Sequence, residues 1–570
     1  MRSPTQQPPS MFSKCLGMKL APKGSKTKDD IRPPAKLLKP YDLALELQQM
    51  CGQGDMDGAF RRLQSTPRDA QNTSVWNTMI SLCTNAGRYK RAYEVFTDMK
   101  RRGFSPNAAT FSTLLKGLSQ IDDWSKHSKQ LANAHTLYGY YMDHIRSVKY
   151  HEPDNTKELN TVPLVFYLSI LGEVGDRQKI FDVFFAMDAE GLFAPDKYLF
   201  CSMFDAITKC QERRSDSNDE ISVSNTAKSD AKYIWLQVEK AVQKQRGFEL
   251  DSRVIGAAIR ALTRGRASDQ ALALDIATKH LGFAMFGERA TLRLSRFLTP
   301  WTLDVTLTLC NTMQRYKLCV HFMRQVIERL DFDKPHERQI VDRSHIHKLL
   351  RAHSALARRG SPDESLQASE VVEWCLENDA IYQLPKLRPD RQTYHLLLMA
   401  CWRNGDWTRL MRSFELMTGI RATSFQDSNQ EQGPPKLPER SANSNHPPDL
   451  ETMSFIMRTA LGTKAVNHYK HAMWLADCVD LGAMLQNPKA DAFYRTRVAM
   501  PLIRIINYLR GEVPAEKYLT WNHLLQTAEE VMGDNEKAAT DEHRKALGRA
   551  WSFKGDDDTL PNANDNDPDK

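Results

Sequence analysis

Three histidines lie close together in the middle of the chain, and imidazole is the side chain most used for metal binding and acid–base chemistry. They are His345, His347 and His353, within one segment whose apolar spacing is helical. His345 and His347 are two residues apart, so they point to different faces of a helix and cannot share one metal ion. The spacing argues against a zinc site, and the sequence predicts no metal.

Glycine-rich and acidic segments also fail to form a catalytic motif. Gly462-Thr463-Lys464 lacks the upstream glycine of a phosphate-binding loop, and no Gly-x-Gly-x-x-Gly occurs. The aspartates at 556–558 fall in a polar tail rather than on a folded α/β element. The sequence therefore predicts no catalytic residue, no cofactor and no small-molecule substrate, and we do not expect an enzyme.

Basic side chains form three clusters that could bind phosphate groups. The clusters are Arg260, Arg264 and Arg266; Lys348, Arg351, Arg358 and Arg359; and Arg403, Arg409 and Arg412. Phosphate neutralisation by such residues would supply most of the affinity for a nucleic acid and make it salt-dependent. The predicted phosphate contacts are Arg260, Arg264, Lys348, Arg351 and Arg403. A solvated helix face is the alternative for each cluster.

The elements that must position these side chains are pairs of amphipathic helices. In the clearest pair, apolar residues recur with the i, i+3, i+4, i+7 spacing of one helix face: Trp76, Met79, Ile80 and Cys83, then Ala92, Val95, Phe96 and Met99. Asn85-Ala86-Gly87 between them is a helix-ending turn signal. Gly103 ends the second helix, and Pro106-Asn107 closes the unit.

The same spacing recurs along the chain. In three units the first apolar residue precedes the turn glycine by 11 residues (76 to 87, 164 to 175, 394 to 405). In the same units it precedes the first apolar residue of the second helix by 16 residues (76 to 92, 164 to 180, 394 to 410). Weaker copies begin near Phe200, Ile255, Val305, Ile346 and Met453, and a helical pair from Leu43 to Leu63 precedes the first unit. One pair cannot bury its apolar faces alone, so neighbours must stack. The sequence predicts an all-α fold, an α-solenoid of divergent helical hairpins.

Residues 75–118 closely resemble the pentatricopeptide repeat (PPR). The matching features are an aromatic residue followed by Asn-Thr (76–78), Ala-Gly-Arg at the turn (86–88), Ala-x-x-Val-Phe-x-x-Met in the second helix (92–99) and Gly-x-x-Pro-Asn at the end (103–107). The tetratricopeptide repeat is also a helical hairpin, but its Trp-x₂-Leu-Gly-x₂-Tyr signature is absent. The resemblance is clear here, good for the units near 108, 164 and 391, and faint elsewhere.

The resemblance implies a function as well as a fold. PPR proteins mostly bind single-stranded RNA in organelles, and those of fungi and animals act almost wholly in mitochondria. A fungal or animal-type member would act in the mitochondrial matrix on the stability, processing or translation of mRNA. The inserts between repeats suit a protein embedded among partners, and by analogy they extend the expectation to rRNA and proteins of the small mitochondrial ribosomal subunit. The alternative is an α-solenoid protein–protein scaffold without direct RNA contact.

The family also implies which residues read bases. One polar residue on the first helix and one at the end of the repeat address a single base. By this correspondence Asn77 with Asn107 prefers a pyrimidine, and Ser112 with Asp154 prefers guanine.

Other units depart from this pattern. Val165 cannot hydrogen-bond a base, and Cys201 and His395 are not standard reading residues. Sequence-tolerant or shape-based binding is therefore expected rather than a long code.

Bulk properties complete the prediction. At 570 residues the chain is too long for one compact core, and its net charge of +8 suits a polyanionic partner. No run of roughly 20 apolar residues occurs, so no membrane span is predicted. The ten cysteines are scattered without a Cys-x-x-Cys pair, which is typical of reduced thiols in a core.

The predicted organisation alternates helical repeats with polar segments. In order, it is a disordered basic N-terminus with the character of a mitochondrial presequence (1–40), N-terminal repeats (41–210), a disordered insert (211–229), divergent repeats (230–420), a second disordered insert (421–448), C-terminal repeats (449–554) and an acidic disordered tail (555–570). No acidic residue precedes Asp29, which favours a presequence; a plain basic tail is the alternative.

Overall fold

The structure, a computed structural model, describes residues 39–152, 154–216, 230–244, 248–288, 294–421 and 445–538. Within these ranges the regular secondary structure is helical, with 23 α-helices and no strand. The predictions made for residues 1–38, 217–229, 422–444 and 539–570 lie outside these ranges.

The chain divides into two compact units, residues 1–105 and 106–570, and each is described by itself. The helices of the first unit are α1 (Pro40–Gly52), α2 (Met56–Ser65), α3 (Thr73–Asn85) and α4 (Tyr89–Arg101). Helix α1 packs against α2 and α3, and α3 packs against α4. Helices α1 and α2 are the pair predicted from Leu43 to Leu63, and α3 with α4 is the hairpin predicted from Trp76.

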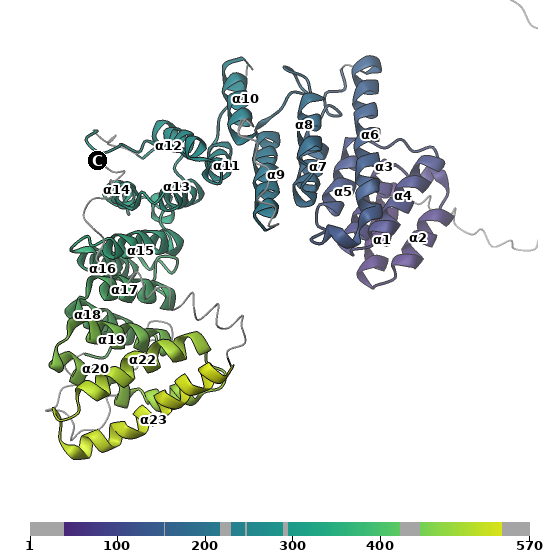
Figure 1. Cartoon of the computed structure of the whole chain (residues 1–570). Coiled ribbons are helices and arrows are strands. Elements are labelled where there is room, and N and C mark those ends of the chain that lie inside the picture. The colour runs from purple at the N-terminus through teal and green to yellow at the C-terminus, as the bar shows by residue number, and fades with distance from the viewer. Residues whose placement is uncertain are drawn as a thin grey trace, which may run out of the picture. The chain divides into compact units, whose positions relative to one another are not determined.

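The second unit continues the hairpins (Figure 1). Its first helices are α5 (Ala108–Leu118), α7 (Val162–Val174), α9 (Lys197–Asp216), α11 (Ser252–Thr263), α13 (Pro300–Thr312), α15 (Arg343–Arg358), α17 (Arg391–Asn404), α19 (Leu450–Thr463) and α22 (Ala492–Tyr508). Its second helices are α6 (Ser128–His151), α8 (Arg177–Phe185), α10 (Asp230–Lys244), α12 (Ala267–Leu281), α14 (Tyr316–Ile327), α16 (Glu364–Tyr382), α18 (Trp407–Thr418), α20 (Val466–Cys478) and α23 (Ala515–Ala538), and the short α21 (Leu481–Gln486) follows α20.

Two layers result from the packing of these helices. Each first helix packs against the first helix of the next hairpin, from α5 through to α22, and each second helix packs against its own first helix. We call the stacked first helices the first-helix layer. This arrangement is the predicted α-solenoid.

The apolar stripes seen in the sequence form the core between the layers. In α17, Tyr394, Leu397, Leu398 and Cys401 are at most 1% exposed, and Phe414 of α18 is fully buried. Burial of one such large side chain stabilises the fold by roughly 1.5–3 kcal/mol. Because each hairpin covers only its own neighbours, the core runs along the stack instead of forming one centre.

The turn inside several hairpins contains a residue with a left-handed backbone. Gly87, Gly175 and Gly405 have φ of +69°, +84° and +67°, a conformation that costs glycine nothing. Gln314 and Lys464 stand at the same turn position of their hairpins with φ of +56° and +54°. The absence of glycine there explains why these two units resemble the repeat only faintly in sequence.

The cysteines and the hydropathy agree with the sequence-based expectation. The nine described cysteines are free thiols, and six of them are buried. Burial raises the pKa of the Cys83 thiol to about 11, which keeps it protonated and unreactive. In the described part of the chain, no helix has the length and apolar character to cross a membrane.

Candidate nucleic-acid interface

Asn107, predicted to read a base from the end of its repeat, lies where the next first helix begins. Asn107 is the N-cap of α5, and its side chain accepts a hydrogen bond from the Thr110 amide at 3.0 Å. Asp390 caps α17 through the Thr393 amide at 2.9 Å. An N-cap of this kind stabilises a helix by about 1 kcal/mol, so these residues have a structural task besides any contact with a base.

Asn77 lies on α3 of the first unit, five residues after the N-cap Asn72, and is partly buried. Asn107 belongs to the second unit, so the two are described separately. Their pairing on one base stays a prediction.

Ser112 and Asp154, both in the second unit, have different surroundings, and their pairing on one base stays a prediction. Ser112 is partly buried on α5, and its hydroxyl donates to the Ala108 carbonyl at 2.9 Å. Asp154 is exposed in the connection between α6 and α7. Glu158 is the carboxylate that reaches α5, because it accepts from the Ala108 amide at 2.7 Å and lies 3.0 Å from His144 Nε2.

Three of the five predicted phosphate contacts tie neighbouring first helices together. Each cation pairs with a carboxylate of the preceding first helix: Arg260 with Asp205 at 3.0 Å, Arg264 with Glu212, and Lys348 with Asp304. Partly exposed pairs of this kind contribute at most about 1 kcal/mol each. Their charges are nevertheless offset locally, which weakens their attraction for phosphate.

Arg403 and Arg351 have different surroundings. Arg403 of α17 donates to the carbonyl and to the hydroxyl of Ser354, both at 2.9 Å. Arg351 of α15 is exposed and has neither a hydrogen bond nor an ion pair to any described residue.

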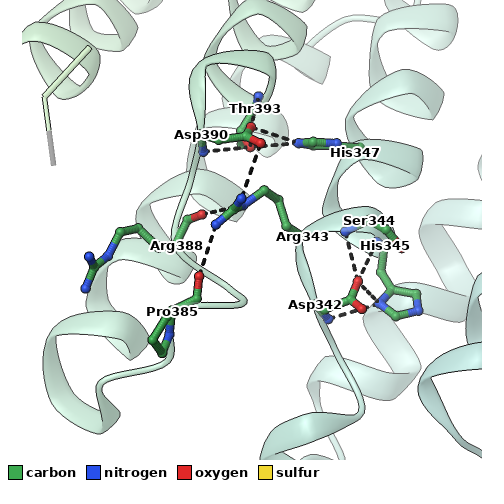
Figure 2. A network of polar contacts seen from close by, with 9 residues as sticks. All are labelled: Asp342, Arg343, Ser344, His345, His347, Pro385, Arg388, Asp390 and Thr393. Carbon is green, nitrogen blue, oxygen red and sulfur yellow. Dashed lines mark hydrogen bonds and ion pairs between the residues drawn. The ribbon is translucent and has the colours of Figure 1, made fainter. Parts of the chain in front are cut away.

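The three histidines have separate partners, as helical spacing predicts for His345 and His347. His345 Nε2 lies 2.8 Å from the Pro300 carbonyl towards α13, whereas His347 faces α17 (Figure 2). His353 pairs with Glu364 at 2.6 Å. No group of three metal-binding side chains occurs among the residues that the structure describes.

His347 occupies the reading position of its hairpin, five residues after the N-cap Asp342. Its Nε2 lies 3.2 Å from the Asp390 carboxylate and 2.9 Å from the Thr393 hydroxyl (Figure 2). Burial, with Arg343 and Arg351 nearby, lowers the pKa of His347 despite the Asp390 charge. The ring nitrogen that could contact a base thus already has partners in the next hairpin, Asp390 and Thr393.

His395, at the same position in the next hairpin, is held by two carboxylates. Nε2 lies 3.2 Å from Asp449 and Nδ1 lies 2.9 Å from Glu451. Burial opposes protonation, but hydrogen bonds to the two carboxylates outweigh it and raise the pKa of His395 to about 9. The imidazolium donates both of its N–H groups inside the protein, so no donor remains for a base.

Sequence reasoning missed Asp390, Asp449 and Glu451 as partners of these histidines. The available signal is the repeated Asp-x-x-Thr at the start of α17 and α19, which forms N-cap hydrogen bonds in both. This motif marks the start of a first helix. Its aspartate is therefore the carboxylate that stands at the end of the preceding hairpin.

Two hollows open on the first-helix layer. The larger, about 830 Å³, lies over α15, α17, the start of α19 and Tyr494 of α22. The smaller, about 390 Å³, lies between α13 and α15 and includes Tyr316 at the start of α14. Arg351 lines both.

Comparison with known proteins identifies one repeat by its family. The family model of the PPR repeat matches residues 71–120. The crystal structure of the pentatricopeptide repeat protein PPR10 from maize is 13% identical over 91% of this chain and 87% of that chain, with a TM-score of 0.28. PPR10 in complex with an 18-nt psaJ RNA element is 11% identical over 91% and 85%, with a TM-score of 0.21. No curated protein sequence matches the chain.

At these identities and TM-scores the solved structures add nothing about function. The family match rests on one repeat, which α3, α4 and α5 form. Residues 71–120 of this chain are thus similar to the PPR repeat family.

Proposed function

We propose that the chain is an RNA-binding PPR protein of mitochondrial gene expression. The observation that carries the proposal is the PPR repeat at residues 71–120, with Asn77 at the polar first-helix position. An amide side chain suits the reading of single-stranded bases because it both donates and accepts hydrogen bonds.

The location and the process are the finer part of the proposal. The basic first 28 residues, with no acidic residue before Asp29, support import into the mitochondrial matrix. The long polar inserts support a place among partners, for which the small mitochondrial ribosomal subunit is the best candidate. A dedicated factor for the stability, processing or translation of one mRNA is the other form of the same function.

A protein–protein scaffold is the second candidate, and one observation favours it. Arg260, Arg264 and Lys348 are paired with carboxylates inside the stack, and two reading positions are closed by Asp390 and Asp449. The first-helix layer therefore has fewer side chains available to contact phosphates or bases of RNA than the sequence predicted.

UV crosslinking of the tagged protein in purified mitochondria, with sequencing of the recovered RNA, tests the proposal. We expect RNA above the level of an untagged control. Small-subunit rRNA would support the ribosomal role, and one transcript would support the dedicated factor. Absence of RNA from a protein shown to be present in the matrix would leave the scaffold as the better explanation.

A further inference from the structure

Arg351 differs from the other cations of the first-helix layer in two ways. It is exposed and lacks a hydrogen-bond or ion-pair partner among the described residues, whereas Arg260, Arg264 and Lys348 reach a carboxylate. It also lines both hollows. We call the two hollows together the Arg351 site.

The charges lining the Arg351 site favour an anion. The acidic residues of the larger hollow are Asp449 and Glu451, and both are engaged by the charged His395. Arg391, also paired with Asp449 at 3.2 Å, and Arg403 add positive charge. The smaller hollow has Lys348 and Arg351 but no acidic lining residue. Arg351 is therefore the cation with its hydrogen-bond donors available to a phosphate.

The hydrogen-bonding groups in the smaller hollow point to a ribose. Asn311 donates through Nδ2 to the Lys348 carbonyl at 3.1 Å, which fixes the orientation of its amide. Its Oδ1 is buried, has no partner and lies in a residue that lines this hollow. An unpaired acceptor in a residue that lines the same hollow as an arginine matches a 2′-hydroxyl next to a phosphate, and the 2′-hydroxyl is the group that distinguishes RNA from DNA.

Base reading is disfavoured along the same stretch. His347 and His395 stand at the reading positions of α15 and α17, and both are engaged by carboxylates of the stack. Tyr494 lines the larger hollow and offers an aromatic ring, on which a base stacks with little regard to sequence. Tyr316 lines the smaller hollow, and the guanidinium of Arg359 lies over its ring, 4.8 Å from the centroid.

We propose that the Arg351 site holds the sugar–phosphate backbone of single-stranded RNA across α13 to α19 without reading its bases. This inference rests on the proposed RNA-binding function and assigns it a place and a mode. Arg351 contacts the phosphate, and Asn311 accepts a hydrogen bond from the 2′-hydroxyl. Because His347 and His395 are already bound to carboxylates of the protein, RNA binding along this stretch does not depend on the base sequence.

The test is RNA binding by the purified full-length chain, measured by fluorescence anisotropy with U, A and C oligoribonucleotides of one length. We expect Arg351→Ala to weaken binding of all three by a similar factor, about tenfold for a lost charge-assisted hydrogen bond. Arg351→Lys should restore part of the affinity. The matched control is Arg412→Ala. It removes one exposed arginine from α18, which is a second helix and therefore not part of the first-helix layer.

The 2′-hydroxyl contact has its own readout. The wild-type chain should prefer oligo-U over the deoxyribose oligomer of the same sequence, and Asn311→Ala should reduce that preference. Circular dichroism checks that each variant is folded.

The outcomes separate the two proposals. If the wild-type chain binds RNA and Arg351→Ala behaves like Arg412→Ala, the Arg351 site is wrong and the RNA-binding function stands. Loss of affinity for only one of the three sequences would also overturn the inference, because it would mean base reading. If the wild-type chain binds none of the RNAs, the proposed function itself fails.

Discussion

His347 and His395 occupy equivalent positions of neighbouring hairpins, yet their surroundings drive their protonation in opposite directions. His347 has one carboxylate and two nearby arginines, and burial lowers its pKa. His395 has two carboxylates, Asp449 and Glu451, which raise its pKa to about 9. One imidazole is thus a neutral acceptor or donor at neutral pH, and the other is a fixed cation.

This contrast gives a prediction for pH dependence. The pKa of His395 is raised above its unfolded value of about 6.5, so its stabilising contribution is full below pH 6.5 and is lost as the pH rises towards 9. The contribution is at most about 3 kcal/mol, since one pKa unit corresponds to about 1.4 kcal/mol. The pKa of His347 is lowered, so its effect has the opposite sign: stability falls as the pH drops through that pKa.

Histidine hydrogen–deuterium exchange followed by mass spectrometry measures both groups in one sample. We expect the pKa of His395 to lie above 6.5 and that of His347 below it. Glu451→Gln removes one of the two carboxylates and should lower the pKa of His395 while leaving His347 unchanged. Equal pKa values for the two histidines in the wild-type chain would contradict the described contacts.

The sequence identified these histidines but not their partners, for a physical reason. Each partner carboxylate begins the next first helix, and His395 and Asp449 are separated by the polar insert at 421–448. Sequence spacing fixes which residues share one helix face, but it does not fix which residue of the next hairpin lies opposite. Asn77 and Ser112 could be named from a motif, whereas Arg351 could not be distinguished from Arg260 until the neighbouring helix was placed.

At the scale of the elements, the turn glycines were predictable because one residue decides the backbone conformation. Gly405 has φ of +67°, which an L-residue adopts at a cost of roughly 1–2 kcal/mol. Gly139 lies inside α6 without a positive φ and has no atom within 4 Å of an added Cβ. The same substitution should therefore act oppositely at the two sites.

We predict that Gly405→Ala destabilises its hairpin by about 1 kcal/mol and that Gly139→Ala stabilises α6 by roughly 0.5–1 kcal/mol. Amide hydrogen exchange of the peptides that cover α17, α18 and α6 resolves the two effects locally, as suits a stacked array without one central core. Faster exchange in α6 of the Gly139→Ala variant, or unchanged exchange in α17 and α18 of Gly405→Ala, would count against this explanation of the turns.

At the scale of the whole chain, the solenoid was predictable because periodic apolar faces require stacked neighbours. The use of its charges was not predictable, because the net charge of +8 does not reveal which cations are paired. Arg260, Arg264 and Lys348 each reach a carboxylate of the preceding first helix, which lies between 44 and 55 residues back along the chain. Such pairs form only once the hairpins are stacked.

The paired and unpaired cations lead to different salt dependences of RNA binding. Each phosphate neutralised on a single strand adds about 0.7 to the slope of log affinity against log salt. If all five predicted contacts bound phosphates, they would contribute about 3.5 to that slope, whereas Arg351 alone would contribute about 0.7. Because carboxylates offset Arg260, Arg264 and Lys348, we predict that substituting Arg351 lowers the measured slope by about 0.7 and that substituting Arg260 leaves it unchanged.

Anisotropy titrations with oligo-U at several salt concentrations, for the wild-type chain, Arg351→Ala and Arg260→Ala, measure these slopes. Arg260→Ala breaks the pair with Asp205, so its effect should appear instead as faster amide exchange in α9 and α11. If Arg260→Ala lowers the slope as much as Arg351→Ala does, the ion pairs between first helices must open when RNA binds. The first-helix layer would then exchange its internal carboxylates for phosphates, and all five cations would belong to the interface.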